Sequence, residues 1–410
     1  MLAFRGYFSE RRNNGTPFQT NATVTRHASG SARGSLLDGA WTARGALFSQ
    51  DYDQTFSQVL PGRAEERPTS VQHVDSAARD AGLEWLKPHS RGALLVGASG
   101  RFVDAELADL SFATGVVAGA DVRQRTQAVF AQTTIAAGRA TIGAGLRAEF
   151  WRSRRVDGSD SRDEHFLVPR ASIAYRATES VTLRTAYQDG HRSPTINELF
   201  RDFRVGNTVT RANAALGPER ARGWEASALV TRPRIGARAA FFWTTLDDAI
   251  INVTLTPGAT IIRQRQNAGR VRSRGLEIES DLRLAAGLAA TATCALIDST
   301  FTRGSDLVGL RVPQVPRVQA SAGFRGTWPR LVAAVEWRFI GHQYDDDRNE
   351  FLLDRSSIAD LKAAWRAGRG LELFAAVENA FDEEQDVGRT PLRTIGLPRT
   401  FRAGIRWERR

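Results

Sequence analysis

The sequence has one cysteine, Cys294, one methionine and only two lysines among its 410 residues. A single cysteine excludes a disulfide framework and any metal site built from several thiolates. No run of eighteen apolar residues occurs, so we expect no transmembrane helix. The N-terminal stretch MLAFRGYFSERRNNG has neither the apolar core nor the small-residue cleavage site of a signal peptide, and we therefore expect none.

Motifs of catalysis are also missing. The sequence contains no G-x-S-x-G, no H-E-x-x-H and no G-x-x-x-x-G-K. The six histidines are scattered, mostly in or beside expected turns. We therefore expect a protein that is not an enzyme, with no catalytic residues, no cofactor and no bound metal.

The charge is strongly one-sided, with a net value of +11 that comes almost entirely from arginine. A basic chain of this kind can bind nucleic acid. Here, however, the arginines alternate with acidic residues along the chain, as in RGLEIESDLRL (residues 274–284), and form no basic cluster. We therefore expect no nucleic-acid partner.

The dominant hydrophobic period is two. In residues 274–284 the apolar Leu276, Ile278 and Leu282 alternate with Glu277 and Glu279, and other segments repeat this pattern. Alternation over about ten residues is typical of a half-buried strand. The acids of this segment would be costly against lipid and are cheap beside a wet lumen, so we assign it a structural role.

Eighteen strands are predicted, with starts near residues 2, 18, 34, 67, 91, 124, 140, 165, 180, 219, 235, 260, 288, 315, 330, 357, 370 and 399. Short turns are expected at 29–33, 87–90, 138–139, 177–179, 232–234, 285–287, 327–329 and 367–369. They alternate with long connections at 9–17, 49–66, 105–123, 153–164, 190–218, 248–259, 301–314, 342–356 and 379–398. Short turns at one end and long loops at the other are typical of an up-and-down membrane barrel. A soluble β-sandwich would mix loop lengths at both ends.

The segment HRSPTINELFRDFRVGN (residues 191–207) interrupts the strands. Pro194 can take the first position of a helical turn, and Thr195 with Glu198 has the spacing of a capping box. One interpretation is a loop that merely ties two strands together. The other is a ligand-contacting platform above the lumen.

The segment HQYDDDRNEF (residues 342–351) places three adjacent aspartates in one long connection. Three consecutive acids in an extended chain cannot all ligate one ion, and the spacing of an EF-hand is absent. A solvated loop is therefore preferred over a calcium site.

Several motifs, in order, resemble the barrel of TonB-dependent outer-membrane receptors. They are Pro194-Thr195 with Asn197-Glu198-Leu199, then Asn213, Leu216, Pro218-Glu219 and Glu225, then Asn267 with Gly275-x-Glu277, and finally Asn379, Phe381 and Asp382 before the last strand. The N-terminal FRGYFSERRNNGTPFQTN is similar to a barrel hairpin of that family. The resemblance spans essentially the whole chain.

The resemblance implies an all-β, antiparallel, up-and-down transmembrane β-barrel, with about 18 strands present of the 22 found in the family. Residues 1–410 are then one N-terminally truncated barrel domain without a plug. The expected location is the outer membrane of a Gram-negative bacterium, as a monomer surrounded by outer-membrane lipid. The TonB complex is a partner only if a missing N-terminal plug is present.

The function implied is uptake of a bulky, scarce ligand, most simply an iron–siderophore chelate. The alternatives are a receptor for cobalamin or another nutrient, a passive porin-like channel, a soluble β-rich protein and a non-functional gene fragment. The expected ligand-binding residues are Arg192, Asn197, Glu198, Arg201, Arg204 and Tyr344. In the closing strand, Phe401, Ala403, Ile405 and Trp407 would face lipid, while Arg402 and Arg406 face the interior.

Overall fold

The computed structural model describes residues 2–13, 16–60, 64–205, 208–258, 260–304, 306–368, 370–390 and 393–408. The chain divides into two compact units. Unit 1 comprises residues 1–171, 188–219 and 250–267, and unit 2 comprises residues 172–187, 220–249 and 268–410. Each unit is described by itself below.

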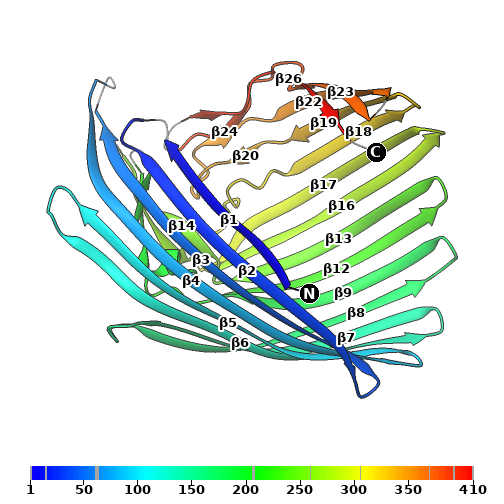
Figure 1. The fold of residues 1–410 in the computed structure, drawn as a ribbon, viewed down its shortest axis with the longest axis horizontal. Coiled ribbons are helices and arrows are strands. Elements are labelled where there is room, and N and C mark those ends of the chain that lie inside the picture. The colour runs from blue at the N-terminus through cyan, green and yellow to red at the C-terminus, as the bar shows by residue number, and fades with distance from the viewer. Residues whose placement is uncertain are drawn as a thin grey trace. The chain divides into compact units, whose positions relative to one another are not determined.

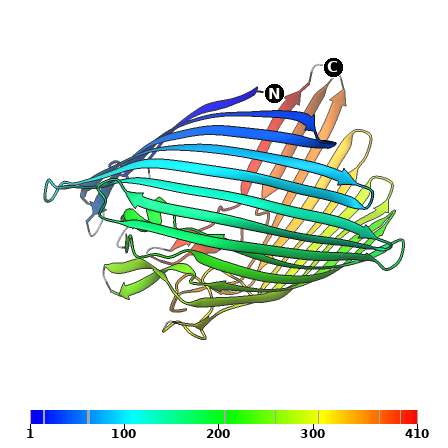
Figure 2. The same ribbon diagram turned by 90° about the horizontal axis from the view of Figure 1, so that it is seen from below.

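Eighteen strands belong to one large sheet, and the pairings within each unit join strands that follow one another along the chain. The antiparallel up-and-down arrangement and the predicted number of strands are thus confirmed. Figures 1 and 2 show the long strands of unit 1, in blue to green, running side by side.

Long strands dominate unit 1. They are β1 (Leu2–Asn13), β2 (Thr20–Leu36), β3 (Gly39–Val59), β4 (Glu66–His89), β5 (Gly92–Ser111), β6 (Val117–Ala137) and β7 (Ala140–Arg155). β8 (Ser161–Arg176) and β9 (Val181–Arg192) each contribute residues to both units. β4 has 24 residues, more than twice the about 9–11 residues that suffice for a strand to cross a bilayer. At a rise of about 3.4 Å per residue it is about 80 Å long.

Unit 2 continues the meander with shorter strands. They are β12 (Glu219–Arg232), β13 (Ile235–Asp247), β16 (Arg270–Ala285), β17 (Leu288–Arg303), β18 (Val318–Thr327), β19 (Leu331–Ile340), β22 (Ser356–Gly368), β23 (Leu371–Glu378) and β26 (Thr400–Trp407). The closing strand β26 pairs with β23, and its alternating side chains Phe401, Ile405 and Trp407 are exposed.

The long connections carry the remaining elements. Unit 1 contains the helix α1 (Ile196–Phe200) and a small sheet of β10 (Phe203–Val205), β11 (Thr208–Arg211), β14 (Ile250–Thr256) and β15 (Ile261–Asn267). Unit 2 contains the pairs β20 (Gln343–Tyr344) with β21 (Leu352–Leu353) and β24 (Asp386–Gly388) with β25 (Thr394–Ile395). No helix in the described part of the chain is long and apolar enough to span a membrane.

The strands β3–β7 have two unlike faces. Cross-strand partners Leu83, Ala98 and Val129 lie on one face, and the next row includes Val96 and Leu146. Leu83 is 54% exposed, Val129 54% and Leu146 51%. We call this the apolar face. The opposite face carries Gln72, Gln124 and Trp151 and supports α1.

Several predicted connections of unit 1 are wrong, in whole or in part. β2 runs through residues 29–33, where a turn was expected, and the hairpin closes instead at Leu37-Asp38. Both turn residues have positive φ, 52° and 57°, a conformation that sequence patterns associate with Asn and Gly. Residues 9–13, 49–59, 105–111 and 117–123 lie in paired strands and not in loops. β3 and β4 stay paired there, with a shift of register between Phe56 and Ser57.

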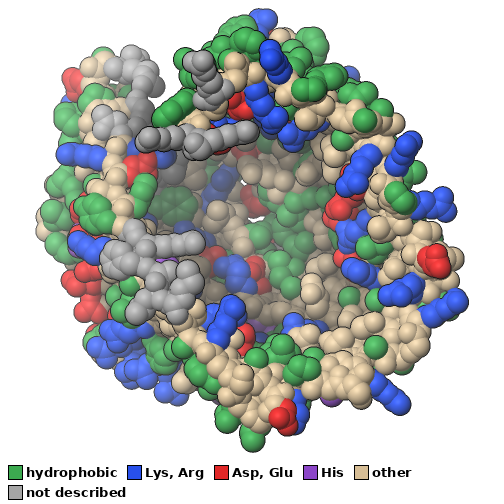
Figure 3. Space-filling view, turned by 45° about the vertical axis from the view of Figure 1, so that its right-hand side comes forward, with side chains coloured by type: hydrophobic (Ala, Val, Ile, Leu, Met, Phe, Trp, Pro, Cys, Tyr) green, Lys and Arg blue, Asp and Glu red, His purple; other side chains and the backbone are tan. Residues whose placement is uncertain are grey.

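Charged side chains of both signs occur over the surface. In Figure 3 Lys and Arg side chains lie beside Asp and Glu at several places on the face shown. In unit 2, Arg238 lies within 4 Å of three acids, Glu225 at 2.6 Å, Glu277 at 3.7 Å and Glu279 at 3.6 Å. Glu277 and Glu279 therefore lie on the side of β16 opposite Leu276 and Ile278, as the alternation predicted.

Candidate functional site

The connection between β9 and β12 forms a compact platform on unit 1, which we define as residues 192–219. Its centre is α1, with Thr195 as N-cap. The Thr195 hydroxyl accepts a hydrogen bond from the Glu198 N–H, and the Glu198 carboxylate accepts one from the Thr195 N–H at 2.8 Å. The predicted capping box is confirmed. Pro194 precedes the N-cap, so it does not occupy the first helical position.

Arg192, the first residue of the platform, forms ion pairs with two of its acidic residues. Its guanidinium contacts Glu198 at 2.9 Å and pairs with Glu219, whose side chain is only 9% exposed. The second Glu219 oxygen accepts the N–H of Ile250 at 2.6 Å. Burial alone would raise the pKa of Glu198, but hydrogen bonds from Arg192 and from the Thr195 N–H outweigh it, so the pKa lies below its usual value. The carboxylate of this cap is therefore ionised at neutral pH.

The underside of the platform is apolar. Leu199 and Leu216 pack with Trp151 of β7 in one cluster, and these three side chains are 2%, 0% and 2% exposed. Ile196 and Phe200 pack on a second cluster formed by Leu107, Ala120 and Val122 of β5 and β6. A helix of five residues is too short to be stable alone, so these contacts hold it in place.

Amide side chains close the platform loop. Asn213 donates to the Arg265 carbonyl at 2.8 Å, and Asn267 bonds both the N–H and the carbonyl of Gly217, at 2.8 and 3.0 Å. The neighbouring β11 pairs with β15 in parallel. Asn213 and Asn267, which carry part of the family resemblance, therefore have structural roles in the described residues.

Arg201 ties the end of α1 to the strands beneath it. Its guanidinium donates to Gln72 at 2.9 Å and to Gln54 at 3.3 Å, and it lies 5.1 Å from the centre of the Tyr52 ring. Gln72 also donates to the Asp202 carbonyl at 2.8 Å. These polar side chains of β3 and β4 were not predicted as site residues, although their alternation places them on one face.

Arg265 of β15 is the second residue that sequence reasoning missed. It donates to the carbonyls of Asn197 and Arg201, the latter at 3.0 Å, and its guanidinium lies 5.0 Å from the centre of the Phe203 ring. Burial lowers its pKa, and the proximity of Arg201 acts in the same direction while Glu198 opposes it. Arg265 thus satisfies carbonyls at the C-terminus of α1, an interaction between segments some 65 residues apart.

The structure separates the six predicted ligand-binding residues by role. Arg192, Glu198 and Arg201 are engaged in the contacts above. Asn197 is exposed, and its side-chain amide makes no hydrogen bond to another described residue. The side chain of Arg204 lies outside what the structure describes. Tyr344 belongs to unit 2. Ligand contact by these six residues stays a prediction.

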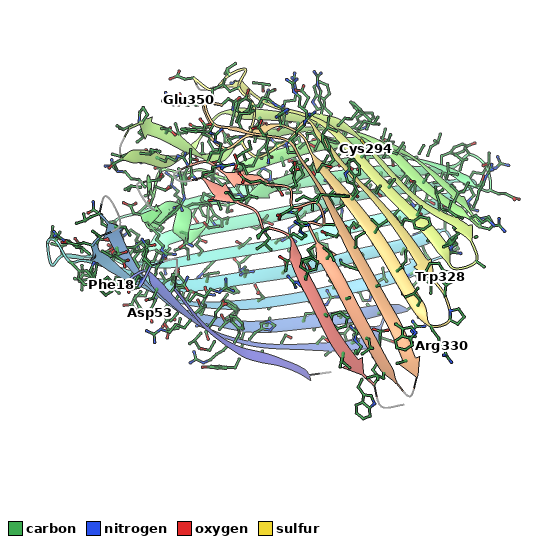
Figure 4. All side chains as sticks on the ribbon, turned by 90° about the horizontal axis from the view of Figure 1, so that it is seen from above. Phe18, Asp53, Cys294, Trp328, Arg330 and Glu350 are labelled. Atoms are coloured by element: carbon green, nitrogen blue, oxygen red, sulfur yellow. The ribbon has the colours of Figure 1, made fainter. Side chains whose placement is uncertain are left out.

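The three aspartates near Tyr344 lie in a loop that is partly buried and held by hydrogen bonds, so the prediction of a solvated loop is wrong. Asp346 and Asp347 are 5% and 4% exposed. Asp346 accepts the N–H groups of Glu350 and Phe351 at 3.0 and 2.8 Å. In Figure 4 Glu350 lies at the end of the strands opposite to Trp328 and Arg330, which mark the short turn between β18 and β19.

Asp345 connects this loop to two other connections of unit 2 by hydrogen bonds. Its carboxylate accepts the N–H groups of Arg389 and Thr390, at 2.8 and 2.7 Å, and the Gln314 amide at 2.9 Å. Burial opposes ionisation, but these donors outweigh it and lower the pKa of Asp345. The aspartate is therefore a charged cross-link between three loops.

One group of potential metal ligands occurs in the described part of the chain: Asp51, Asp53 and His73. It lies on the side of β3 and β4 away from α1, and Figure 4 marks Asp53 near one end of β3. The His73 ring nitrogen lies 2.8 Å from an Asp53 oxygen, so a hydrogen bond between the two side chains accounts for the geometry.

Comparisons with known proteins agree with one another. The chain matches the family model described as "TonB dependent receptor-like, beta-barrel" over residues 2–380. The metal-pseudopaline receptor CntO of Pseudomonas aeruginosa (strain UCBPP-PA14) is 25% identical over 235 residues, covering 55% of this chain and 31% of that protein. The ferrichrome outer membrane transporter/phage receptor of Escherichia coli (strain K12) is 23% identical over 243 residues, covering 56% and 30%.

The fold is similar as well. The ferric yersiniabactin uptake receptor FyuA from Yersinia pestis has a TM-score of 0.76 at 19% identity, covering 96% of this chain and 63% of that chain. The chain thus spans less than two thirds of the length of these relatives.

Proposed function

Because the chain belongs to the TonB-dependent receptor β-barrel family, we propose that it forms an outer-membrane receptor barrel for a bulky metal chelate, an iron–siderophore complex. Members of this family are outer-membrane β-barrels. The chelate would bind without covalent chemistry, through polar side chains on the platform of unit 1. Uptake by the whole protein is part of the proposal.

The observation that carries the proposal is the division of β3–β7 into two faces. Leu47, Leu83, Val129 and Leu146 are each more than half exposed on one face. Water-soluble monomers rarely expose a continuous apolar surface of this kind, whereas lipid-facing strands of a barrel require one. The other face carries glutamines, arginines and the α1 platform, which suits a hydrated interior.

The platform supports chelate binding through what it leaves available. Asn197 presents an amide with a donor and an acceptor, and the Arg192 side chain is 45% exposed although it is ion-paired. Siderophore complexes carry carbonyl, hydroxamate, catecholate or carboxylate oxygens, which accept from such groups. Glu198 and Arg201 would then hold the binding surface in place. The names of the relatives above, which mention metal-pseudopaline, ferrichrome and ferric yersiniabactin, support this ligand class.

Titration with defined chelates tests the proposal. The chain, refolded in detergent and inserted into phosphatidylcholine vesicles, would receive ferric citrate, ferrichrome or ferric enterobactin, with tryptophan fluorescence as the readout. We expect saturable quenching by one of them, at micromolar or lower concentration, and at least about tenfold weaker quenching by the iron-free ligand. Stable ion conductance without discrimination among chelates would favour a passive channel. A stable monomer without detergent would contradict the membrane placement.

A further inference from the structure

Along strands β4–β7, the apolar residues of the apolar face are followed by a row that contains arginines. Arg79, Phe102, Arg125 and Arg152 are directly opposite one another on β4, β5, β6 and β7. This row lies four residues, about 14 Å at 3.4 Å per residue, beyond the row that contains Val129. The three arginines are exposed. We call the rows that contain Leu83, Val129 and Leu146 the apolar belt. A row of cations therefore lies next to this belt on the same face of the sheet.

The next row adds two arginines. Asp104, Arg123 and Arg154 are cross-strand partners on β5, β6 and β7. Asp104 lies 3.6 Å from Arg79 and 3.4 Å from Arg123, and Asp163 pairs with Arg152. Neither Arg125 nor Arg154 has an acidic partner among the described residues. Five arginines against two aspartates leave a net charge of 5 − 2 = +3 in these two rows.

The β4, β5 and β6 members of these rows line a groove of about 820 Å³; Arg152 and Arg154 of β7 lie outside its lining. Its inner end, nearest the apolar belt, is formed by Arg79, Arg125 and the Phe102 ring. Its outer end is formed by acids, and a row of four carboxylates, Asp51, Asp75, Glu106 and Asp121, lies there in cross-strand register. An anion is therefore favoured only at the inner end, beside the arginines, and is repelled by the carboxylates beyond.

The same order of side chains recurs in unit 2. Trp224 and Trp243 are cross-strand partners and 44% and 39% exposed. The Arg272 and Arg274 guanidiniums lie 5.8 and 5.5 Å from the centre of the Trp243 ring. Interfacial tryptophans mark the boundary of the hydrocarbon region, so arginine follows that boundary here too.

We propose that Arg79, Arg125 and Arg152, assisted by Arg123 and Arg154, bind the phosphate groups of a lipid headgroup at the outer boundary of the apolar belt. The inference rests on the membrane placement proposed above. Guanidinium is suited to bidentate contact with phosphate. Cationic clusters next to a hydrocarbon-facing surface recognise anionic headgroups, because the acyl chains hold the phosphate at that depth. The groove has the volume of a small-ligand site.

The test compares lipid A, which carries two phosphates, with dephosphorylated lipid A. Each is added to the refolded chain in detergent, and bound lipid is counted by native mass spectrometry. We expect at least about tenfold preference for the phosphorylated lipid, and loss of that preference in the triple variant Arg79→Gln/Arg125→Gln/Arg152→Gln. The single variant Arg125→Gln, which breaks no ion pair, should lose about threefold or more.

The matched control is Arg44→Gln/Arg101→Gln/Arg147→Gln, which removes three arginines from the opposite face of β3, β5 and β7. It should keep the full preference. Equal binding of both lipids, or equal loss in control and triple variant, would overturn the inference alone if the chain still enters phosphatidylcholine vesicles. Failure of the unmodified chain to enter those vesicles would refute the membrane placement and the inference with it.

Discussion

Leu199→Ala should accelerate hydrogen exchange of the α1 amides at least about thirtyfold. Leu199 is 2% exposed between Trp151 and Leu216, and truncation of a buried leucine costs about 2–5 kcal/mol through lost contacts and the cavity left behind. Because about 1.4 kcal/mol corresponds to a factor of ten, the lower limit predicts a thirtyfold change in local opening. The strands themselves should exchange as before, since their ladders do not depend on α1.

The control for this variant is Leu397→Ala. Leu397 is 73% exposed in the connection after β23, so its truncation should change exchange by less than a factor of about two. Hydrogen exchange followed by mass spectrometry reads both variants in the same detergent. Unchanged protection of residues 196–200 in Leu199→Ala would contradict the view that packing under the platform holds α1.

Arg192→Leu should destabilise the platform by about 2–3 kcal/mol, because it leaves two carboxylates without their cation. The side chains of Glu219 and Glu198 are only 9% and 18% exposed, so water solvates the two carboxylates poorly once their cation is removed. The expected cost is below that of a fully buried pair because the Arg192 side chain is 45% exposed. Exchange of the 196–200 amides is again the readout.

A double variant separates the ion pair from other effects of Arg192. Arg192→Leu/Glu219→Gln removes the stranded charge and should recover more than half of the loss. Arg67→Leu, which breaks a pair with Glu65 whose side chains are 69% and 60% exposed, should cost less than about 0.5 kcal/mol. Additive effects of Arg192→Leu and Glu219→Gln would show that the two side chains act independently.

Much of the fold follows from local pattern. Alternation of apolar and polar residues predicts most of the strands because each buries or exposes one face, and the capping box at Thr195 and Glu198 depends only on residues three apart. The expected strand near residue 260 is the main exception. In the structure β15 joins the small sheet, and β16 begins separately at Arg270.

What the sequence could not reveal depends on distant partners. Asp346 and Asp347 are buried because backbone N–H groups of the same loop surround Asp346 and other loops cover the segment, whereas their composition favours solvent. The hydrogen bonds of Arg265 to α1, and the parallel pairing of β11 with β15, join segments more than fifty residues apart. Arg192 and Glu198 are ion-paired within the platform, whereas the Asn197 amide makes no hydrogen bond to another described residue. This difference depends on contacts that the sequence does not reveal.

Quenching by bound iron tests the central proposal, chelate binding at α1, most directly. In a Cys294→Ala background, a fluorophore is attached at Asn197→Cys and, as control, at Arg330→Cys in the turn between β18 and β19. Ferric citrate, ferrichrome or ferric enterobactin is then titrated into each labelled chain. We expect saturable quenching at position 197 by the chelate that the unlabelled chain binds, and little quenching at position 330. Equal quenching at both positions, or none at 197 while tryptophan fluorescence still reports binding, would contradict the proposal.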